Sequence, residues 1–514
     1  MTDPRQVPAR VPVTTHRHTT RQLAMLPAYC ALADRYGTDE VYLLESAAGP
    51  AGDRRYRFLG FGSLLSLSVT EETVTIEGNP ALRRSLLGAV RHLLDTPDHP
   101  DDPDTGLLPD PDADFTGLRL RTPHDLWPLL RAASALFDAE GSASRFTFGF
   151  LGYFGYDTIR YVEELPRLID ARPGLPDIHL VLHQGCLVTD LATDESELLL
   201  HESPYWPALD TDEVTTLLDR CEQTHPEPET DPDVPESHVE DDTDPDVFHA
   251  DVERCLKHIA VGDIYQVQIG HELSIRSAID PVHVYRRLRR RNASPYMYLS
   301  SIAGHRVIGA SPELFVRIED GTVTMRPIAG TVPRSDSGDE ADDLAAAHRL
   351  RSDPKEIAEH TMLVDLCRND IGRICGPDTL EVPDQLTVES YSHVLHLVST
   401  VHGQATADAD VYDIVPALFP AGTMTGTPKI RAMEIIESVE RTRRGLYAGA
   451  LGLIDVGGYT NLALCIRTLF HRDGTYRTRA SAGIVADSVP GSEWRETLAK
   501  MSAAHWAVAG KELL

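Results

Sequence analysis

The sequence has no long apolar run. No stretch of the 514 residues approaches the roughly 20 apolar residues that a membrane-spanning helix needs. The most apolar N-terminal segment, residues 23–33, is interrupted by Pro27 and lacks a clear cleavage pattern, so we expect no signal peptide. The hydrophobic content of 42% is typical of a soluble globular chain. We therefore expect a protein without membrane association.

Paired cysteines are also missing. The chain has seven cysteines, an odd number, and none of them forms a CxxC pair. This pattern favours reduced thiols over a disulfide framework, and with it a cytoplasmic location.

Basic residues are few. Lys and Arg number 48 against 79 Asp and Glu, and the formal net charge of −31 predicts repulsion of nucleic acid and of anionic membranes. Part of this charge lies in two Pro-rich segments, residues 96–114 with seven acidic residues and residues 222–246 with eleven, and neither contains Lys or Arg. Such composition predicts loops or linkers. An anionic substrate would therefore need local cations in its pocket.

Two Glu-x-x-Glu pairs stand out among the residues that are present. Glu356 and Glu359 form one pair, and Glu493 and Glu496 form the other, more than a hundred residues later. On a helix, residues three apart share a face, so each pair can direct two carboxylates at one point. Because Mg²⁺ prefers oxygen ligands and keeps positions open for substrate oxygens, the pairs predict a magnesium site for an anion.

The chain divides at its second acidic segment. We expect an N-terminal region over residues 1–221, an acidic linker over 222–247 and a catalytic region over 248–514. Strand-like and helix-like segments mix without regular βαβ alternation, which indicates an α+β protein. Asp353 followed by Pro354 predicts a helix that begins there.

Each remaining motif has an ordinary structural alternative. The Gly/Thr-rich segment 420–429 can bind an anion or form a simple tight loop. Arg467 can grip a carboxylate or form a surface ion pair, and Lys500 can pair with Glu496 four residues earlier. His360 can be catalytic or structural, and Glu313, after a proline, can be a positioned acid or a turn residue.

Taken together, these segments resemble anthranilate synthase component I and the wider group of chorismate-utilising enzymes. The resemblance is dense in the C-terminal half and extends towards the start through LLES (43–46) and GYFGYDTIRYVEELP (152–166). The C-terminal segments that carry it are GDIYQV (262–267), ASPELF (310–315), PIAGT (327–331), KEIAEHTMLVDLCRNDIGR (355–373), PAGTMTGTPKIRAMEII (420–436), IRT (466–468) and AGIVADS (482–488). The resemblance implies a two-lobed α+β fold in which two packed β-sheets form the core, helices lie outside, and the site occupies a cleft at one side.

The resemblance also implies roles for the acidic and cationic residues. Mg²⁺ would be held by Glu359 and Glu496, with Glu356 and Glu493 close by or bridging through water. Thr423 would lie beside the substrate ring. The residues expected at the carboxylates of chorismate are Tyr447, Arg467, Gly483 and Lys500.

The expected chemistry follows from four further positions. Glu313 matches a general acid that protonates the departing C4 hydroxyl, and His360 matches a histidine associated with pyruvate elimination. Relatives that add water carry a lysine where this chain has Gln266, and aminodeoxychorismate synthases typically carry one where it has Ala329. Without either lysine, ammonia is expected to attack C2 directly.

The expected main product is anthranilate, formed by amination and then pyruvate loss. The alternative is an enzyme of secondary metabolism that stops at the amino-deoxy intermediate. Two other readings stay open: a water-adding enzyme, which Gln266 disfavours, and a non-catalytic sensing subunit, which the four glutamates disfavour.

The resemblance implies partners as well. No cysteine lies in the Gly-x-Cys-x-Gly pattern of a glutamine amidotransferase, so a separate glutaminase subunit is expected to supply ammonia, in a homo- or hetero-oligomer. Tryptophan is a candidate feedback inhibitor. The residues that match the tryptophan pocket of inhibited relatives are Glu45, Ser46, Pro295, Tyr296 and Met297.

Overall fold

The computed structural model describes residues 10–50, 52–95, 115–170, 174–222, 234–334, 340–391 and 394–514. The first acidic segment, 96–114, and residues 223–233 of the expected linker lie outside these ranges. Among the described residues, no helix is both long and apolar enough to cross a membrane. All seven cysteines are described and none is in a disulfide bond.

Two long strands organise the sheets. β4 (Tyr56–Thr70) and β10 (Ile178–Asp190) pair antiparallel along almost their whole length, with a register shift after Leu182. On one side of this shift the pair continues into β3 and β11, and on the other side into β5 and β9. The two strands therefore pass from one sheet into a second.

The first sheet contains strands from both halves of the chain. The order of its paired strands is β2, β11, β10, β4, β3, β14, β15, β24, β25 and β13. The short strands β12 and β21 also pair with β13. The bounds are β2 (Thr14–Thr20), β11 (Glu195–Glu202), β3 (Val41–Glu45), β14 (Tyr296–Ile302), β15 (His305–Ser311), β24 (Thr468–Arg472), β25 (Thr475–Ile484), β13 (Gln266–Arg276), β12 (His238–Asp241) and β21 (Gly426–Thr427).

The second sheet is built in the same way, and its pairing runs from β6 through β7, β5, β4, β10, β9, β22, β23, β16 and β17 to β20, which β18 and β19 flank. The bounds are β6 (Leu94–Asp95), β7 (Phe115–Leu120), β5 (Thr73–Gly78), β9 (Gly149–Phe154), β22 (Ala450–Asp455), β23 (Thr460–Leu464), β16 (Leu314–Glu319), β17 (Thr322–Met325), β20 (Val394–Gln404), β18 (Ile328–Pro333) and β19 (Glu381–Ser390). A separate parallel pair joins β1 (Val11–Pro12) to β8 (Phe137–Asp138).

A core between the two sheets holds them together. Tyr42 and Tyr298 of the first sheet belong to one apolar cluster with Tyr153 and Leu451 of the second. Burial of such large side chains stabilises the sandwich by roughly 1.5–3 kcal/mol each. The expected core of two packed sheets is confirmed.

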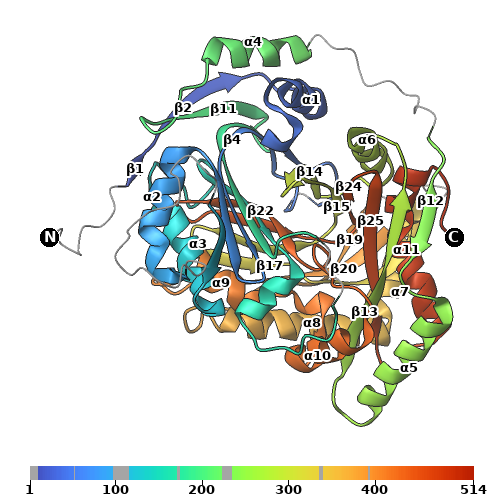
Figure 1. Ribbon diagram of the computed structural model, residues 1–514. Helices are drawn as coiled ribbons and strands as arrows, with labels where there is room; N and C mark the ends of the chain where they lie inside the picture. Colours follow the sequence, from blue (N-terminus) through green and yellow to red (C-terminus); the bar gives the residue numbers. More distant parts are fainter. Residues whose placement is uncertain are drawn as a thin grey trace.

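Helices cover the outer faces of the sheets (Figure 1). Those packed on the first sheet are α1 (Met25–Tyr36), α4 (Thr211–Glu222), α6 (Pro281–Arg291) and α11 (Pro490–Ala509). Those packed on the second sheet are α2 (Pro80–Val90), α3 (Leu126–Ala135), α7 (Glu340–Ser352), α8 (Pro354–Gly372) and α9 (Val411–Leu418). α5 (Pro245–Ala260) and α10 (Lys429–Val439) lie against β13 and β25. The short 3₁₀ helices are η1 (Thr38–Glu40), η2 (Arg91–Leu93), η3 (Pro123–Asp125), η4 (Tyr156–Tyr161) and η5 (Gly422–Met424).

The N-terminal and C-terminal regions share both sheets. β3 pairs with β14, and β9 pairs with β22, so backbone hydrogen bonds cross between the regions twice. The last part of the expected linker is also structured differently, because residues 238–241 form β12 on β13 and α5 already begins at Pro245. The structured N-terminal region thus contributes strands to the same core as the catalytic region.

Candidate active site

Two crossovers between the sheets lie side by side. Residues 311–314 connect β15 of the first sheet to β16 of the second, and residues 464–468 connect β23 back to β24. The Leu464 N–H donates to the Glu313 carbonyl at 3.0 Å, and the Ala310 N–H donates to the Arg467 carbonyl at 3.2 Å. These bonds fix the backbones of Glu313 and Arg467 next to each other.

A cavity of about 540 Å³ opens beside these crossovers. The two helices with Glu-x-x-Glu pairs, α8 and α11, supply part of its wall, and β13, β18, β20, β25 and η5 supply much of the rest. Its volume falls in the range of pockets that hold small molecules. The predicted residues that line it are Gln266, Glu313, Ala329, Glu356, Glu359, Thr423, Tyr447, Arg467, Gly483, Glu493, Glu496 and Lys500.

The α8 pair is positioned as the sequence predicts. The Asp353 carboxylate accepts from the Lys355 N–H at 2.9 Å and caps the helix, with Pro354 in its first turn. Gly330 has φ +68°, and a Cβ there would lie 2.8 Å from Glu356 Oε2. Glycine at this position therefore leaves room for the carboxylate.

The four glutamates face one cavity and repel one another. Burial first, and then the charges of neighbouring carboxylates, raise the pKa values of Glu356 and Glu359. Burial also raises the pKa of Glu493, with a further contribution from Glu496. No three of these carboxylates converge within 4.8 Å, since the sole group of that kind among the described residues is Asp241, Asp242 and His271. An all-oxygen donor set around one cavity fits a hard divalent cation such as Mg²⁺.

Glu313 has the environment of a protonated acid. Burial raises its pKa to about 8, against weaker opposing effects from the Thr423 hydrogen bond and from Lys500. The Thr423 hydroxyl donates to Glu313 Oε1 at 3.0 Å. Glu313 therefore carries a proton at neutral pH and can donate it to a leaving group.

The cavity wall also carries cationic side chains, and one of them is Arg467. Arg467 has φ +51°, an uncommon backbone region for a residue other than glycine. Its side chain makes no hydrogen bond or ion pair with the described part of the chain, and burial lowers its pKa. A partly buried guanidinium without a carboxylate partner is suited to an anionic ligand.

Lys500 combines its two expected roles. Its ammonium pairs with Glu496 at 2.7 Å, the helical contact expected of a surface pair, and it donates to the Ser481 carbonyl at 2.9 Å. Both residues nevertheless line the cavity, so the pair belongs to the site.

Amide groups flank Gly483, which lies within strand β25 opposite Gln268 of β13. A Cβ at Gly483 would lie 2.9 Å from the amide nitrogens of both Gln266 and Gln268. Gln266 donates to Glu359 Oε1 at 3.3 Å, and the Ser481 hydroxyl donates to Gln268 Oε1 at 3.1 Å. Glycine at this position therefore leaves room for the two amide groups.

His360 is not brought to this cavity. It is fully buried, its Nε2 pairs with the Ser399 hydroxyl at 2.7 Å, and burial lowers its pKa to about 4. On a helix, residue 360 is rotated by roughly 100° from Glu359, which directs it towards β20. Its observed contact thus links α8 to β20.

Sequence reasoning missed His396, which lines the cavity from β20. Its Nδ1–H donates to the Gly330 carbonyl at 3.1 Å, and burial lowers its pKa to about 4. The available signal was a histidine inside the apolar strand-like run 394–398. Gln268 and Ser481 were also missed, and alternation along β13 and β25 could have placed both on the Gln266 and Gly483 face.

The residues expected to form a tryptophan pocket also gather in one place. Glu45, Ser46, Pro295, Tyr296 and Met297 line a second cavity, of about 50 Å³, between the two sheets. Asp53 partly fills this region, because its carboxylate accepts from the Tyr296 hydroxyl at 3.1 Å and pairs with Arg326.

One cavity thus brings together an acid and a cation from the two crossovers and the glutamates of α8 and α11. This fold and site are those of a chorismate-utilising enzyme. Residues 93–505 match the family of chorismate binding enzymes, and the chain belongs to this family. It is 69% identical over 516 residues to a 2-amino-4-deoxychorismate synthase from Streptomyces globisporus, a match that covers all of both chains. It is 36% identical to an anthranilate synthase component 1 from Acinetobacter calcoaceticus, over 91% of this chain and 90% of that one.

A solved structure agrees with these similarities. The anthranilate synthase component I of Streptococcus pneumoniae superimposes with a TM-score of 0.66 at 28% identity, and the match covers 88% of this chain and 92% of that chain. The expected anthranilate synthase-like fold is therefore confirmed. The full-length similarity to a 2-amino-4-deoxychorismate synthase favours the alternative product over anthranilate.

Proposed function

We propose that this enzyme aminates chorismate at C2 and releases 2-amino-4-deoxychorismate without eliminating pyruvate. The observation that carries this proposal is the 69% identity, over the whole chain, to a protein of that name. The name describes the product of C2 amination, because nitrogen has been added at C2 and the hydroxyl has left C4. It is the same intermediate at which the alternative expectation stops.

The nucleophile is ammonia in this proposal. Gln266 and Ala329 both line the cavity, so no lysine ammonium occupies either position. The Gln266 amide donates to Glu359 and cannot act as a base towards water. Ammonia needs no such base, because its lone pair is already nucleophilic.

Glu313 supplies the proton for the leaving group. Its buried carboxyl, with a pKa of about 8, protonates the C4 hydroxyl so that it departs as water while nitrogen bonds to C2. Arg467 and Lys500 offset the negative charge of the substrate's carboxylates, and Tyr447 lines the same cavity.

We assign Mg²⁺ to Glu359 and Glu496, with Glu356 and Glu493 beside them. Support comes from the oxygen-only donors and from the raised pKa values of Glu356, Glu359 and Glu493, which burial causes first and neighbouring carboxylates add to. When bound, the cation would hold the ring carboxylate of the substrate and neutralise part of the acidic cluster.

The geometry supports release before pyruvate loss. Elimination requires a base that removes the C2 proton, and His360 is buried against Ser399 away from the cavity. His396 lines the cavity, but with a pKa lowered to about 4 it is a weak proton acceptor. Complete conversion to anthranilate is the second candidate, favoured by the relatives at 36–42% identity.

We also propose that a separate glutaminase subunit delivers the ammonia. A thiol that hydrolyses glutamine needs a lowered pKa. Burial instead raises the pKa to about 12 for Cys186, Cys255 and Cys465, and to about 11 for Cys375. The chain thus lacks an activated thiol at these positions.

The experiment that tests the proposal compares products. Purified protein is incubated with chorismate, Mg²⁺ and ammonium, and the mixture is analysed by mass spectrometry and by a lactate dehydrogenase assay for pyruvate. The proposal predicts an aminated product that keeps its enolpyruvyl group, with no pyruvate. Stoichiometric pyruvate with anthranilate fluorescence would instead support the second candidate.

A further inference from the structure

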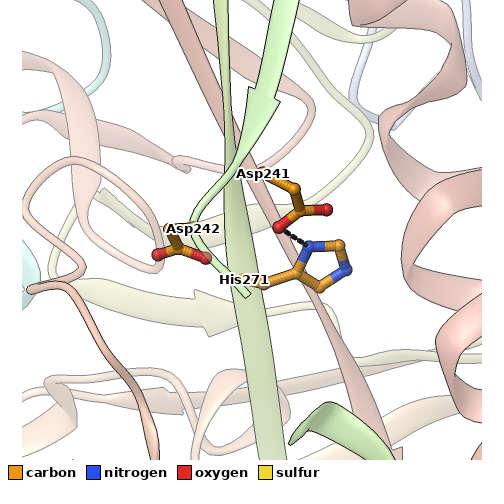
Figure 2. Close-up of side chains that lie close together, drawn as sticks. All are labelled: Asp241, Asp242 and His271. Atoms are coloured by element: carbon orange, nitrogen blue, oxygen red, sulfur yellow. Dashed lines mark hydrogen bonds and ion pairs between the residues drawn. The ribbon is translucent and has the colours of Figure 1, made fainter. Parts of the chain in front are cut away.

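A buried histidine lies behind the helix that carries Glu493 and Glu496. His271 is on β13 and has no exposed surface. Its Nδ1 pairs with Asp241 Oδ1 at 2.8 Å, the bond drawn in Figure 2, and its Nε2 pairs with the Thr497 hydroxyl at 2.7 Å. Thr497 belongs to α11 and immediately follows Glu496. A hydrogen-bonded connection therefore runs from β12 through β13 to α11.

The Asp241 carboxylate can only accept, so His271 Nδ1–H donates to it. The Thr497 hydroxyl lies within hydrogen-bond distance of both His271 Nε2 and the Trp494 carbonyl, each at 2.7 Å. Asp241 Oδ1 also accepts from the Thr243 N–H at 3.1 Å, which orients the carboxylate towards the ring. The imidazole is thus held from both sides and cannot rotate without losing a bond.

An aromatic stack fixes the same helix at a second point. The rings of His271 and Trp494 are parallel within 14°, with centroids 4.2 Å apart. Phe248 of α5 meets both rings edge-on, at 5.6 Å and 5.3 Å. Pairs of this geometry contribute roughly 0.5–1.5 kcal/mol beyond burial. Trp494 immediately follows Glu493, just as Thr497 follows Glu496.

The cluster is better explained by these hydrogen bonds than by a second metal ion. Asp241, Asp242 and His271 place ligand atoms within 4.8 Å of one another (Figure 2). Each of these residues already has protein partners, however. Asp242 accepts from the Glu272 N–H at 3.0 Å with one oxygen and from the Thr442 hydroxyl at 2.5 Å with the other. An ion would have to displace several satisfied bonds.

The N-terminal turns of α11 need such support. Val489 at the N-cap offers no side-chain hydrogen bond to the helix. Glu496 on the same turns lies close enough to α8 for its charge to contribute to the raised pKa values of Glu356 and Glu359. Trp494 and Thr497 lie one residue, or roughly 100° of helical rotation, from Glu493 and Glu496. The back of the helix is therefore held in place where Glu496 on its front meets like charge.

We propose that His271, oriented by Asp241, is a positioning residue that holds Glu493 and Glu496 at the cation site through Thr497 and Trp494. This inference rests on the proposed Mg²⁺ assignment. Loss of the connection lets the first turns of α11 move away from α8, which lowers metal affinity while every ligand stays in the sequence. Outer partners of metal ligands typically change affinity by roughly 10–100-fold when removed.

The test measures Mg²⁺ binding to the full chain by isothermal titration calorimetry, without chorismate or ammonia. His271→Phe keeps an aromatic ring against Trp494 and removes both hydrogen bonds, and Thr497→Val removes the link at the helix. His271→Gln is the rescue variant, because its amide can still hydrogen-bond to Thr497. His258→Phe is the matched control, since His258 Nδ1 also pairs with an aspartate, Asp263, at 2.8 Å but lies outside the connection. Circular dichroism confirms that each variant is folded.

We expect His271→Phe and Thr497→Val to raise the Mg²⁺ Kd by about tenfold, with kcat at saturating Mg²⁺ within about twofold of wild type. His271→Gln should recover most of the affinity, and His258→Phe should match wild type. Unchanged Kd values in both His271→Phe and Thr497→Val overturn the positioning role while leaving the proposed function intact. Absence of Mg²⁺ binding by the wild-type protein overturns the metal assignment and this inference with it.

Discussion

Replacement of Glu313 by glutamine tests the acid that the structure assigns. The amide keeps the size and the Thr423 contact but cannot release a proton to the C4 hydroxyl. General acid catalysis typically contributes 10²–10⁴-fold, so we expect kcat to fall by about that factor at pH 7. The chorismate KM should change little, because the neutral carboxyl and the amide bind alike.

The pH dependence of kcat/KM follows from the burial of Glu313. With a pKa of about 8, the wild-type acid is protonated at pH 7 and ionised above pH 8, so kcat/KM should fall on the alkaline side. Rates are to be expressed per unionised ammonia, whose concentration itself rises with pH. Glu313→Gln should lack this alkaline decline in its residual activity.

Stability gives an independent check of the pKa. Burial raises the pKa from 4.5 to about 8, so the folded state holds the proton more tightly than the unfolded state. This contribution is complete below pH 4.5 and is lost as pH rises to about 8, by roughly 2–5 kcal/mol, the lower figure allowing for water in the cavity. Glu313→Gln should therefore be more stable than wild type at pH 9, measured by urea unfolding. Residual activity above one tenth, or a flat wild-type profile from pH 7 to pH 9.5, would refute the assignment.

Three further perturbations test other parts of the site. Glu496→Ala removes a carboxylate assigned to Mg²⁺, and we expect at least about a 10³-fold loss of chorismate turnover, with Mg²⁺ binding lost in calorimetry; full activity with chelator present would contradict the metal assignment. Arg467→Lys loses bidentate recognition of a carboxylate and should lower kcat/KM by about 10- to 100-fold in steady-state assays, whereas an unchanged value would remove Arg467 from the substrate site. L-Tryptophan at 1 mM should inhibit less than about twofold, because the 50 Å³ cavity near Tyr296 is far smaller than the roughly 300–1,000 Å³ of pockets that hold small molecules; strong inhibition would contradict this prediction.

Local patterns predicted the helix that carries Glu356 and Glu359 and its N-terminal cap. The spacing of Glu356 and Glu359 and the Asp353 cap depend only on helical geometry, and both are observed. The two-sheet core was predicted through resemblance, since pairings such as β3 with β14 join residues about 250 positions apart. No periodicity within either strand specifies that partner.

The errors concern positions that depend on packing between elements. His360 is adjacent to Glu359 in sequence but faces β20. His396 lines the cavity from β20, at the position paired with Thr331 of β18. The acidic composition around residue 241 predicted a solvated linker. Instead, Asp241 and Asp242 accept hydrogen bonds from His271 and Thr442 at the edge of the first sheet. Composition cannot distinguish solvated carboxylates from paired ones when their partners lie far along the chain.

The most direct test of the account is a timed product analysis with chorismate, ammonium and Mg²⁺, using mass spectrometry and pyruvate detection on the same samples. The account predicts that chorismate disappears as an aminated, enolpyruvyl-bearing product accumulates, and that no pyruvate forms. Anthranilate and pyruvate released in equal amounts from the first time point would contradict it.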